Sequence, residues 1–181
     1  MTTPSANPVS QIKHGQIQHG KVALGSDEAG YELKEILKRH LSAQGIETED
    51  FGVQDGETAL YPDVAFAVAE QVAAGVFERA VLLCGTGIGV AISANKVPGI
   101  RAAQAHDTYS AERARKSNNA QIITLGARVI GPELAKSVVD AFLRSEFEGG
   151  GSSAKVDRIN AYDQEHRQAR SDALDRELSG C

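Results

Sequence analysis

A cysteine stands directly before a glycine-rich turn in the stretch LLCGTGIGVAISANK, residues 82–96. Glycine weakens a strand or a helix, so Gly85, Gly87 and Gly89 indicate that bare backbone is needed beside the thiol of Cys84. Successive backbone N–H groups in such a turn can face a ligand oxygen, and a helix that starts there adds partial positive charge. The stretch therefore predicts a site for an anion or an oxyanion.

The residues alone leave two interpretations of Cys84 open. A thiol near a helix N-terminus has its thiolate favoured and can accept a proton near neutral pH, as a general base must. A buried cysteine is also commonly a small hydrophobic residue of the core. Nucleotide binding is disfavoured, because GTGIGV lacks the later glycine of the dinucleotide motif and the lysine and hydroxyl of a phosphate loop.

Reactive side chains also follow two other expected strands. Ligands of open parallel sheets bind where loops leave the carboxyl ends of the strands. Three such ends read GSDEAG, LCGTGIG and AHDTYS, and they are expected to converge at one crevice. This convergence would bring Asp27, Glu28 and His106 to the same edge of the sheet as Cys84.

The elements that must position these side chains alternate along the chain from Lys21 onward. Short apolar runs alternate with segments of helical periodicity, which is typical of a parallel sheet wrapped by helices. We expect an α/β domain over residues 21–148, with five strands in a doubly wound order. The strands are expected at residues 21–26, 47–53, 79–85, 99–105 and 121–126, and the helices at 27–45, 61–75, 89–96, 108–117 and 131–145.

The two ends of the chain differ from this domain. Residues 1–20 contain no apolar run of signal-peptide length and are expected to form a flexible extension. Residues 149–181 open with a glycine hinge and continue as a charged helix with sparse apolar residues, which cannot make a core of its own. This C-terminal helical arm is expected to pack on a second subunit, and a solvated, partly frayed tail is the alternative. The sparse apolar residues of the arm are Val156, Ile159, Tyr162 and Leu174.

The composition narrows the class of protein. The chain has 181 residues, 41% of them hydrophobic, and a formal net charge of −5, so it has no basic face for nucleic acid. It contains no run of eighteen uncharged apolar residues, so no membrane span is expected. Its 2 cysteines, one of them terminal, cannot form a disulfide framework, and a reducing, cytoplasmic location fits best.

Taken together, the motifs resemble the ribose-5-phosphate isomerase B family, which also includes galactose-6-phosphate and tetrose-phosphate isomerases. The resemblance covers residues 21–160 and is carried by GSDEAGYELK, DFG, YPD, CGTGIGVAISANKVPGIRA and DTYSAERARKSNNAQIITLGARVIGPELAK. It implies a Rossmann-like three-layer fold and an aldose–ketose isomerase of a sugar phosphate, without metal or cofactor. It also implies a dimer or tetramer whose active site lies between subunits.

The resemblance further implies roles for individual residues. Cys84 would be the base that moves a proton between C1 and C2, and the amides of residues 85–89 would hold the enediolate oxygen. The other assignments are Asp27 to a substrate hydroxyl, Tyr61 to the pocket wall, Thr86 as a proton relay, Asn95 with Lys96 to the frame of the turn, Asn118 to the substrate, and Arg115 to the phosphate across the interface. Four of these residues also have a structural interpretation: Asp27 as a helix cap, Tyr61 as packing before Pro62, Lys96 as a solvated side chain, and Arg115 as a surface residue.

The chain departs from the pentose isomerases at two histidines. Those enzymes carry one directly after the aspartate of the first loop and another, which is thought to open the furanose ring, before the asparagine pair. Glu28 and Ser117 stand at these positions here. A four-carbon sugar phosphorylated on O4 cannot close a five-membered ring, so the chain resembles the D-erythrulose 4-phosphate isomerase branch. His106, near the end of another strand, could substitute for the ring-opening histidine, or with an open substrate it could bind a hydroxyl or the phosphate.

The phosphate clamp has also changed. Where the pentose enzymes place arginine and histidine after the last helix of the domain, this chain has Gly151, Ser152 and Lys155. Either Lys155, the amides of GGGSS and Arg115 make a smaller phosphate site, or the anion is held elsewhere. The alternatives to a tetrose-phosphate isomerase are a ribose-5-phosphate isomerase of type B and a non-catalytic module that binds sugar phosphates.

Overall fold

The computed structural model describes residues 20–179, with side chains as far as residue 168. The N-terminal extension expected at residues 1–20 lies outside the described residues except for Gly20, and so does the side chain of Leu174. The remaining elements can be compared with the sequence directly.

Five parallel strands form a single sheet in the order β2-β1-β3-β5-β4. The direction of winding reverses between β1 and β3, and sheets of this kind bind ligands outside the carboxyl ends of the strands at such a reversal. In the strand register Ser26 lies opposite Leu83, and Cys84 lies opposite Gly126, so the ends of β1, β3 and β5 are adjacent. The strands are β1 (Val22–Ser26), β2 (Thr48–Asp50), β3 (Ala80–Cys84), β4 (Ala102–Gln104) and β5 (Ile122–Gly126).

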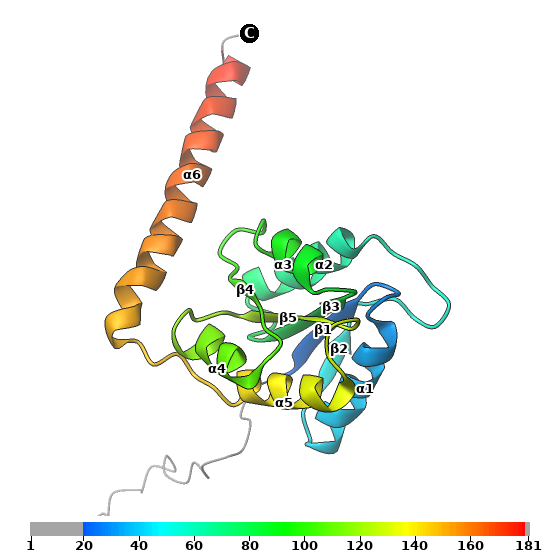
Figure 1. The fold of residues 1–181 in the computed structure, drawn as a ribbon. Helices are drawn as coiled ribbons and strands as arrows, with labels where there is room; N and C mark the ends of the chain where they lie inside the picture. Colours follow the sequence, from blue (N-terminus) through cyan, green and yellow to red (C-terminus); the bar gives the residue numbers. More distant parts are fainter. Residues whose placement is uncertain (1–19, 180–181) are drawn as a thin grey trace, which may run out of the picture.

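Helices cover both faces of this sheet (Figure 1). One face carries α1 (Tyr31–Ala43), α4 (Thr108–Lys116) and α5 (Pro132–Leu143), and the other carries α2 (Tyr61–Ala73) and α3 (Ile88–Ala94). The apolar sides of the helices pack on the sheet, and its three central strands, β1, β3 and β5, are buried along their whole length, as parallel sheets require. The predicted three-layer α/β fold with a five-stranded parallel sheet is confirmed.

A buried ion pair ties α1 to the end of β2. Lys34 is fully buried, and its ammonium donates to both carboxylate oxygens of Asp50 at 2.8 Å and to the carbonyl of Val53 at 2.8 Å. Burial opposes ionisation of Asp50, but hydrogen bonds from Lys34 and Lys38 outweigh it and hold the pKa of this carboxyl below its usual value. Since the N–H of Val53 donates to Ser26, this pair also fixes the end of β1.

The long C-terminal helix α6 (Ser153–Ser179) leaves the domain after the short 3-10 turn η1 (Gly150–Ser152) (Figure 1). Its 27 residues correspond to about 40 Å. Val156 is buried at its base, and Asn160 and Asp163 bond to Arg101 and to the backbone N–H of Gly99. Within residues 20–179, no helix combines the length and apolar composition needed to cross a membrane.

Candidate active site

Cys84 is the last residue of β3 and lies at the carboxyl edge of the sheet. Its sulfur accepts a hydrogen bond from the backbone N–H of Gly87 at 3.1 Å. The residue is 5% exposed and also belongs to the apolar cluster beneath α2 and α3. The thiol thus packs on the core and is also bound by the glycine turn, so its place is not that of a core residue alone.

The turn after Cys84 offers free backbone donors. Among the residues that the structure describes, the amides of Gly85, Thr86 and Gly89 donate to no acceptor. The amide of Gly87 is used by the sulfur. Fixed backbone N–H groups beside a reacting carbon are the donors that stabilise an oxyanion. This turn can therefore hold a negative oxygen next to the thiol.

Two glycines allow the turn to lie directly against the backbone of β5. Gly87 has φ +78°, which favours glycine, and a Cβ built there would lie 2.8 Å from the carbonyl carbon of Leu125. A Cβ built on Gly126 would lie 2.6 Å from the backbone of Thr86. Because backbone packs on backbone here, the oxyanion donors are held rigidly before any ligand binds.

Tyr61 begins α2, and its ring lies over the same turn. A Cβ built on Gly89 would approach the ring to 2.6 Å, so the aromatic ring contacts bare backbone. The residue is 42% exposed. Tyr61 therefore forms one side of the space above the glycine turn.

Asp27 follows β1 and is largely buried. One of its carboxylate oxygens accepts the backbone N–H of Gly30 at 3.0 Å, in the turn that precedes α1. Burial raises the pKa of the Asp27 carboxyl, against the hydrogen bond from Gly30, and the nearby Glu28 raises it further while Arg128 lowers it. Asp27 thus braces its own turn and leaves its second oxygen available to a ligand hydroxyl.

Arg128 is a cation at this edge that the sequence reasoning missed. It lies in the loop after β5, and a Cβ built on Gly85 would be 3.5 Å from its guanidinium. Its backbone N–H donates to the carbonyl of Gly85 at 3.0 Å. The rule that pointed to the other strand ends, applied to LGARV after the fifth strand, would have identified this residue.

His106 follows β4 and is fixed to the end of β5. Its Nε2 accepts the backbone N–H of Gly126 at 2.9 Å, so the proton of the neutral ring is on Nδ1. Gly126 lies opposite Cys84 in the sheet. The imidazole therefore shares an edge with the thiol and has one nitrogen left to donate.

A cleft of about 570 Å³ opens beside Asp27 rather than over the thiol. Its walls come from the first turns of α1, residues 54–58 and the start of α5, and they do not include Cys84. Glu28 lies on its rim, where its carboxylate accepts the backbone N–H of Ala59 at 3.4 Å. This cleft is thus next to the loop that carries Asp27 and does not reach the buried thiol of Cys84.

Asn95 and Asn118 lie at the opposite, amino edge of the sheet. The side-chain amide of Asn95 bonds the N–H and the carbonyl of Ala102 at 2.9 and 2.8 Å, so it holds β4 rather than the glycine turn. Asn118 is exposed and precedes β5. The length of β5, 5 residues or about 13 Å, separates it from the edge that carries Cys84. Neither asparagine reaches the thiol of its own chain.

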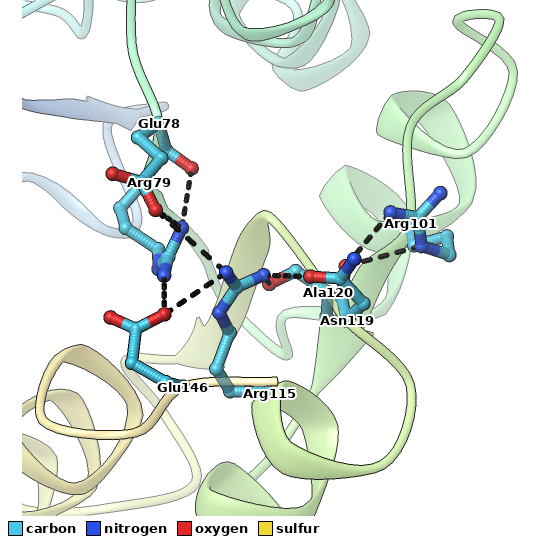
Figure 2. Close-up of polar contacts among 7 residues, drawn as sticks. All are labelled: Glu78, Arg79, Arg101, Arg115, Asn119, Ala120 and Glu146. Carbon is cyan, nitrogen blue, oxygen red and sulfur yellow. Dashed lines mark hydrogen bonds and ion pairs between the residues drawn. The ribbon is translucent and has the colours of Figure 1, made fainter. Parts of the chain in front are cut away.

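Arg115 also lies at the amino edge, in the cluster of charged side chains drawn in Figure 2. It is largely buried and pairs with Glu146 at 3.3 Å and Glu78 at 3.7 Å. Burial and the neighbouring Arg79 lower the pKa of its guanidinium, whereas the carboxylate of Glu146 raises it. With Arg79 and Arg101, this guanidinium borders a hollow at the amino edge, away from the glycine turn of its own chain. The expected contact with phosphate across an interface stays a prediction.

The three residues at the expected position of the phosphate clamp lie at the base of the arm. Gly151 and Ser152 belong to η1, and Lys155 is exposed in the first turn of α6. Among the described residues, no hydrogen bond or ion pair joins these three to the glycine turn of the same chain. Within residues 20–168, moreover, no three His, Cys, Asp or Glu side chains come together as a metal site would require.

The fold and the site define an α/β enzyme that places a thiol and free backbone donors at the switch point of a parallel sheet. Residues 22–159 match the family model described as Ribose/Galactose Isomerase, and the chain belongs to this family. It is a sugar-phosphate isomerase.

Two relatives and one solved structure illustrate the likeness. The D-erythrulose-4-phosphate isomerase of Pectobacterium atrosepticum is 54% identical over 147 residues, which are 81% of this chain and 97% of the relative. The ribose-5-P isomerase B of Listeria innocua is 56% identical over 147 residues, 81% and 99% of the two chains. The structure of ribose-5-phosphate isomerase B from Clostridium thermocellum superposes with a TM-score of 0.78 at 42% identity, over 81% of this chain and 99% of that one.

Proposed function

We propose that this isomerase interconverts D-erythrulose 4-phosphate and D-erythrose 4-phosphate. The observation that carries this choice lies at position 117, where the pentose isomerases place the histidine associated with ring opening. Ser117 stands there, and its hydroxyl accepts a hydrogen bond from the Arg113 guanidinium at 3.0 Å. A hydroxyl does not exchange protons near neutral pH as an imidazole does. An open four-carbon substrate has no need of that step, because its O4 is blocked by the phosphate.

The proposed reaction uses the sulfur of Cys84 as the base. As a thiolate it removes a proton from C1 of the ketose, so that the C1–H bond breaks, an S–H bond forms and C2 becomes part of an enediolate. The free amides of Gly85, Thr86 and Gly89 stabilise the negative oxygen. The thiol then returns the proton to C2, while the hydroxyl of Thr86 moves a proton between the two oxygens. No atom or electron is gained or lost overall.

Asp27 and Arg128 are proposed to hold the rest of the substrate. Asp27 lies at the end of β1, beside the switch point, and its second carboxylate oxygen would bind a hydroxyl of the sugar. Arg128 is the exposed cation beside the glycine turn, and a guanidinium grips phosphate with two parallel hydrogen bonds. His106, Glu28 and Tyr61 would complete the walls on this side.

A second copy of the chain is proposed to close the site. Large apolar side chains are exposed around the glycine turn: Leu60 and Tyr61 at the start of α2, and Ile88 and Ile92 on α3. Exposed apolar patches of this kind mark interfaces. A partner seated there could supply Asn118, which lies about 13 Å of strand away from the thiol of its own chain. Lys155 at the base of the partner's arm would be a second contribution.

The test of the substrate compares initial rates on D-erythrulose 4-phosphate and D-ribulose 5-phosphate. We expect kcat/KM to favour the four-carbon sugar by at least about tenfold, since Ser117 replaces the imidazole proposed to open a furanose ring. Faster turnover of the pentose would instead identify a type B ribose-5-phosphate isomerase, the alternative that the similarity to the Listeria enzyme favours.

The test of the chemistry is the variant Cys84→Ala, with Cys181→Ser as the matched cysteine control. Loss of the base should lower kcat by about 10²–10⁴-fold while substrate still binds. In deuterated water the wild-type protein should introduce deuterium at the carbon that is protonated. A module that only binds the sugar phosphate would give neither turnover nor deuterium, and full activity of Cys84→Ala would exclude the thiol as the base.

A further inference from the structure

The turn at residues 117–120 leaves α4 through an unusual backbone conformation. Asn119 has φ +49°, and it is the one residue other than glycine with positive φ in the described part of the chain. Asparagine tolerates this conformation better than other side chains do, and it is a common way to end a helix. The N–H groups of Asn119 and Ala120 donate back to the carbonyls of Arg115 and Ala114 at 3.1 and 3.0 Å.

Arg115 holds this turn from inside the domain (Figure 2). One terminal nitrogen of its guanidinium donates to the side-chain oxygen of Asn119 and, at 3.4 Å, to the carbonyl of Ala120. The other terminal nitrogen pairs with Glu146, which also binds Arg79 at 3.0 Å. The guanidinium thus bridges the turn and the carboxylate of Glu146, which Arg79 also binds.

Arg101 holds the same turn from the other side. Its Nε donates to the carbonyls of Asn118 and Asn119, each at 3.1 Å, and its Nη2 donates to the carbonyl of Asn119 at 3.0 Å. Its Nη1 reaches the arm, where it donates to the side chain of Asn160 at 2.8 Å. Two arginines therefore clamp one turn and connect it to the base of α6.

One side chain of this turn is neither buried nor hydrogen-bonded to a described residue. Ser117 is bound by Arg113, Asn119 is bound by Arg115, and Ala120 is buried. The side chain of Asn118 is exposed and makes no hydrogen bond to any residue that the structure describes. Left-handed backbone held by converging hydrogen bonds is a common way to aim a functional side chain.

We propose that Arg115 is a positioning residue of this isomerase, which with Arg101 holds the turn at residues 117–120 so that Asn118 alone projects toward the active site of a second copy. The proposal rests on the proposed function, in which Asn118 is lent across the interface. It assigns Arg115 to the shape of that turn and not to the phosphate.

The first experiment measures Arg115→Gln. The matched control is Arg144→Gln, because Arg144 is an exposed arginine whose ion pair, with Asp140, lies one helical turn away at the end of α5. We expect kcat on D-erythrulose 4-phosphate to fall about tenfold, the value of one well-placed hydrogen bond. Competitive inhibition by inorganic phosphate should stay within about twofold of wild type. If the inhibition constant for phosphate instead rose about tenfold with kcat unchanged, Arg115 would be a phosphate ligand and the proposal would be wrong.

A double-mutant cycle with Asn118→Ala separates positioning from a general loss of stability. If Arg115 acts through Asn118, the double variant should be no slower than Asn118→Ala alone. Additive losses would contradict the proposal. Arg115→Lys should stay impaired, because a single ammonium cannot bind Asn119 and Glu146 as the planar fork does. Full rescue by lysine would show that only the charge matters, which also contradicts it.

A second variant covers the case in which Arg115→Gln does not fold. Asn119→Gly keeps a residue that accepts positive φ and leaves the ion pairs of Arg115 intact, but removes the oxygen that Arg115 grips. We expect the backbone ¹⁵N order parameters of residues 118–120 to fall in this variant. Unchanged order parameters would overturn the proposal. This readout needs no turnover, so an inactive wild-type protein would refute the proposed function while the loosened turn still supported the role of Arg115.

Discussion

The carboxyl group of Asp27 has both a structural contact and a proposed contact with the substrate. Its turn needs an acceptor for the N–H of Gly30, and its place at the switch point needs a group that can bind a sugar hydroxyl. Burial raises the pKa of this carboxyl above the ordinary value of 3.8. An acid with a raised pKa binds more protons in the folded than in the unfolded state, so its contribution to stability is complete below that ordinary value and is lost as pH rises through the raised one.

Because the raised pKa of Asp27 makes the folded state less stable as pH rises, it predicts the behaviour of Asp27→Asn. The amide keeps an oxygen for Gly30 but cannot ionise, so the variant should gain stability relative to wild type as pH rises from about 3 to 7. Turnover should fall at the same time, because the carboxylate is lost from the site. Thermal unfolding across this pH range checks the first part, with Asp157→Asn on the exposed face of α6 as the control. A stability difference that did not change with pH would contradict the assignment.

At the scale of elements, the site is a contact between the turn after β3 and the end of β5. Gly126 meets the backbone of Thr86, and Gly89 meets the ring of Tyr61, both at 2.6 Å from a built Cβ. The two contacts differ in what can move. The backbone of Thr86 is fixed between a strand and a helix, whereas the Tyr61 ring is partly exposed and can swing aside.

Alanine at these two glycines should therefore have different effects. Gly126→Ala should lower the free energy of unfolding by about 1–3 kcal/mol, as overpacking of a rigid contact does, and should also misplace the oxyanion donors. Gly89→Ala should unfold close to wild type but raise KM, because the displaced ring no longer forms the pocket wall. Denaturant unfolding and steady-state kinetics on both variants check this. Equal losses of stability would contradict the distinction between backbone and ring.

The secondary structure elements and the edge that carries the site could be predicted from the sequence. Strands and helices follow from local periodicity, and the structure confirms all five strands of the sheet. The ends of parallel strands share an edge, so the neighbourhood of Asp27, Cys84 and His106 was also predictable. Arg115 was not, because whether an arginine near a helix end turns outward or inward depends on carboxylates far away in sequence, here Glu146 and Glu78.

The positions of two other residues, Asn95 and Arg128, did not follow from the sequence motifs. Asn95 belongs to the same motif, CGTGIGVAISANK, as Cys84, but the seven residues of α3 separate the two and place Asn95 at the opposite edge of the sheet. Arg128 was within reach of the strand-end rule but lay in a loop without an unusual residue pattern. The strand-end rule would have placed it at the carboxyl edge, but its close approach to Gly85 could not be predicted from the sequence.

At the scale of the whole molecule, the chain carries an arm, α6, that extends beyond its domain (Figure 1). The base of α6 is fixed by Val156, by the bond from Arg101 to Asn160 and by the bond from Gly99 to Asp163. Two large side chains of the arm, Ile159 and Tyr162, are 51% and 54% exposed. A helix with an anchored base and uncovered apolar side chains is suited to pack on a neighbouring copy.

Truncation after Glu148, which removes the arm, should therefore weaken the assembly of the proposed oligomer. We expect the dissociation constant of the oligomer, measured by sedimentation of the full-length and truncated proteins, to rise at least about tenfold. The double variant Ile159→Ser and Tyr162→Ser is the sharper form of the test, since it keeps the base of the helix and removes only the exposed apolar contacts. If both proteins kept the wild-type mass at the lowest measurable concentration, the arm would be a solvated tail. In that case the proposed contact that brings Asn118 of a second copy to the site would depend on the exposed face around Ile88 and Ile92 alone.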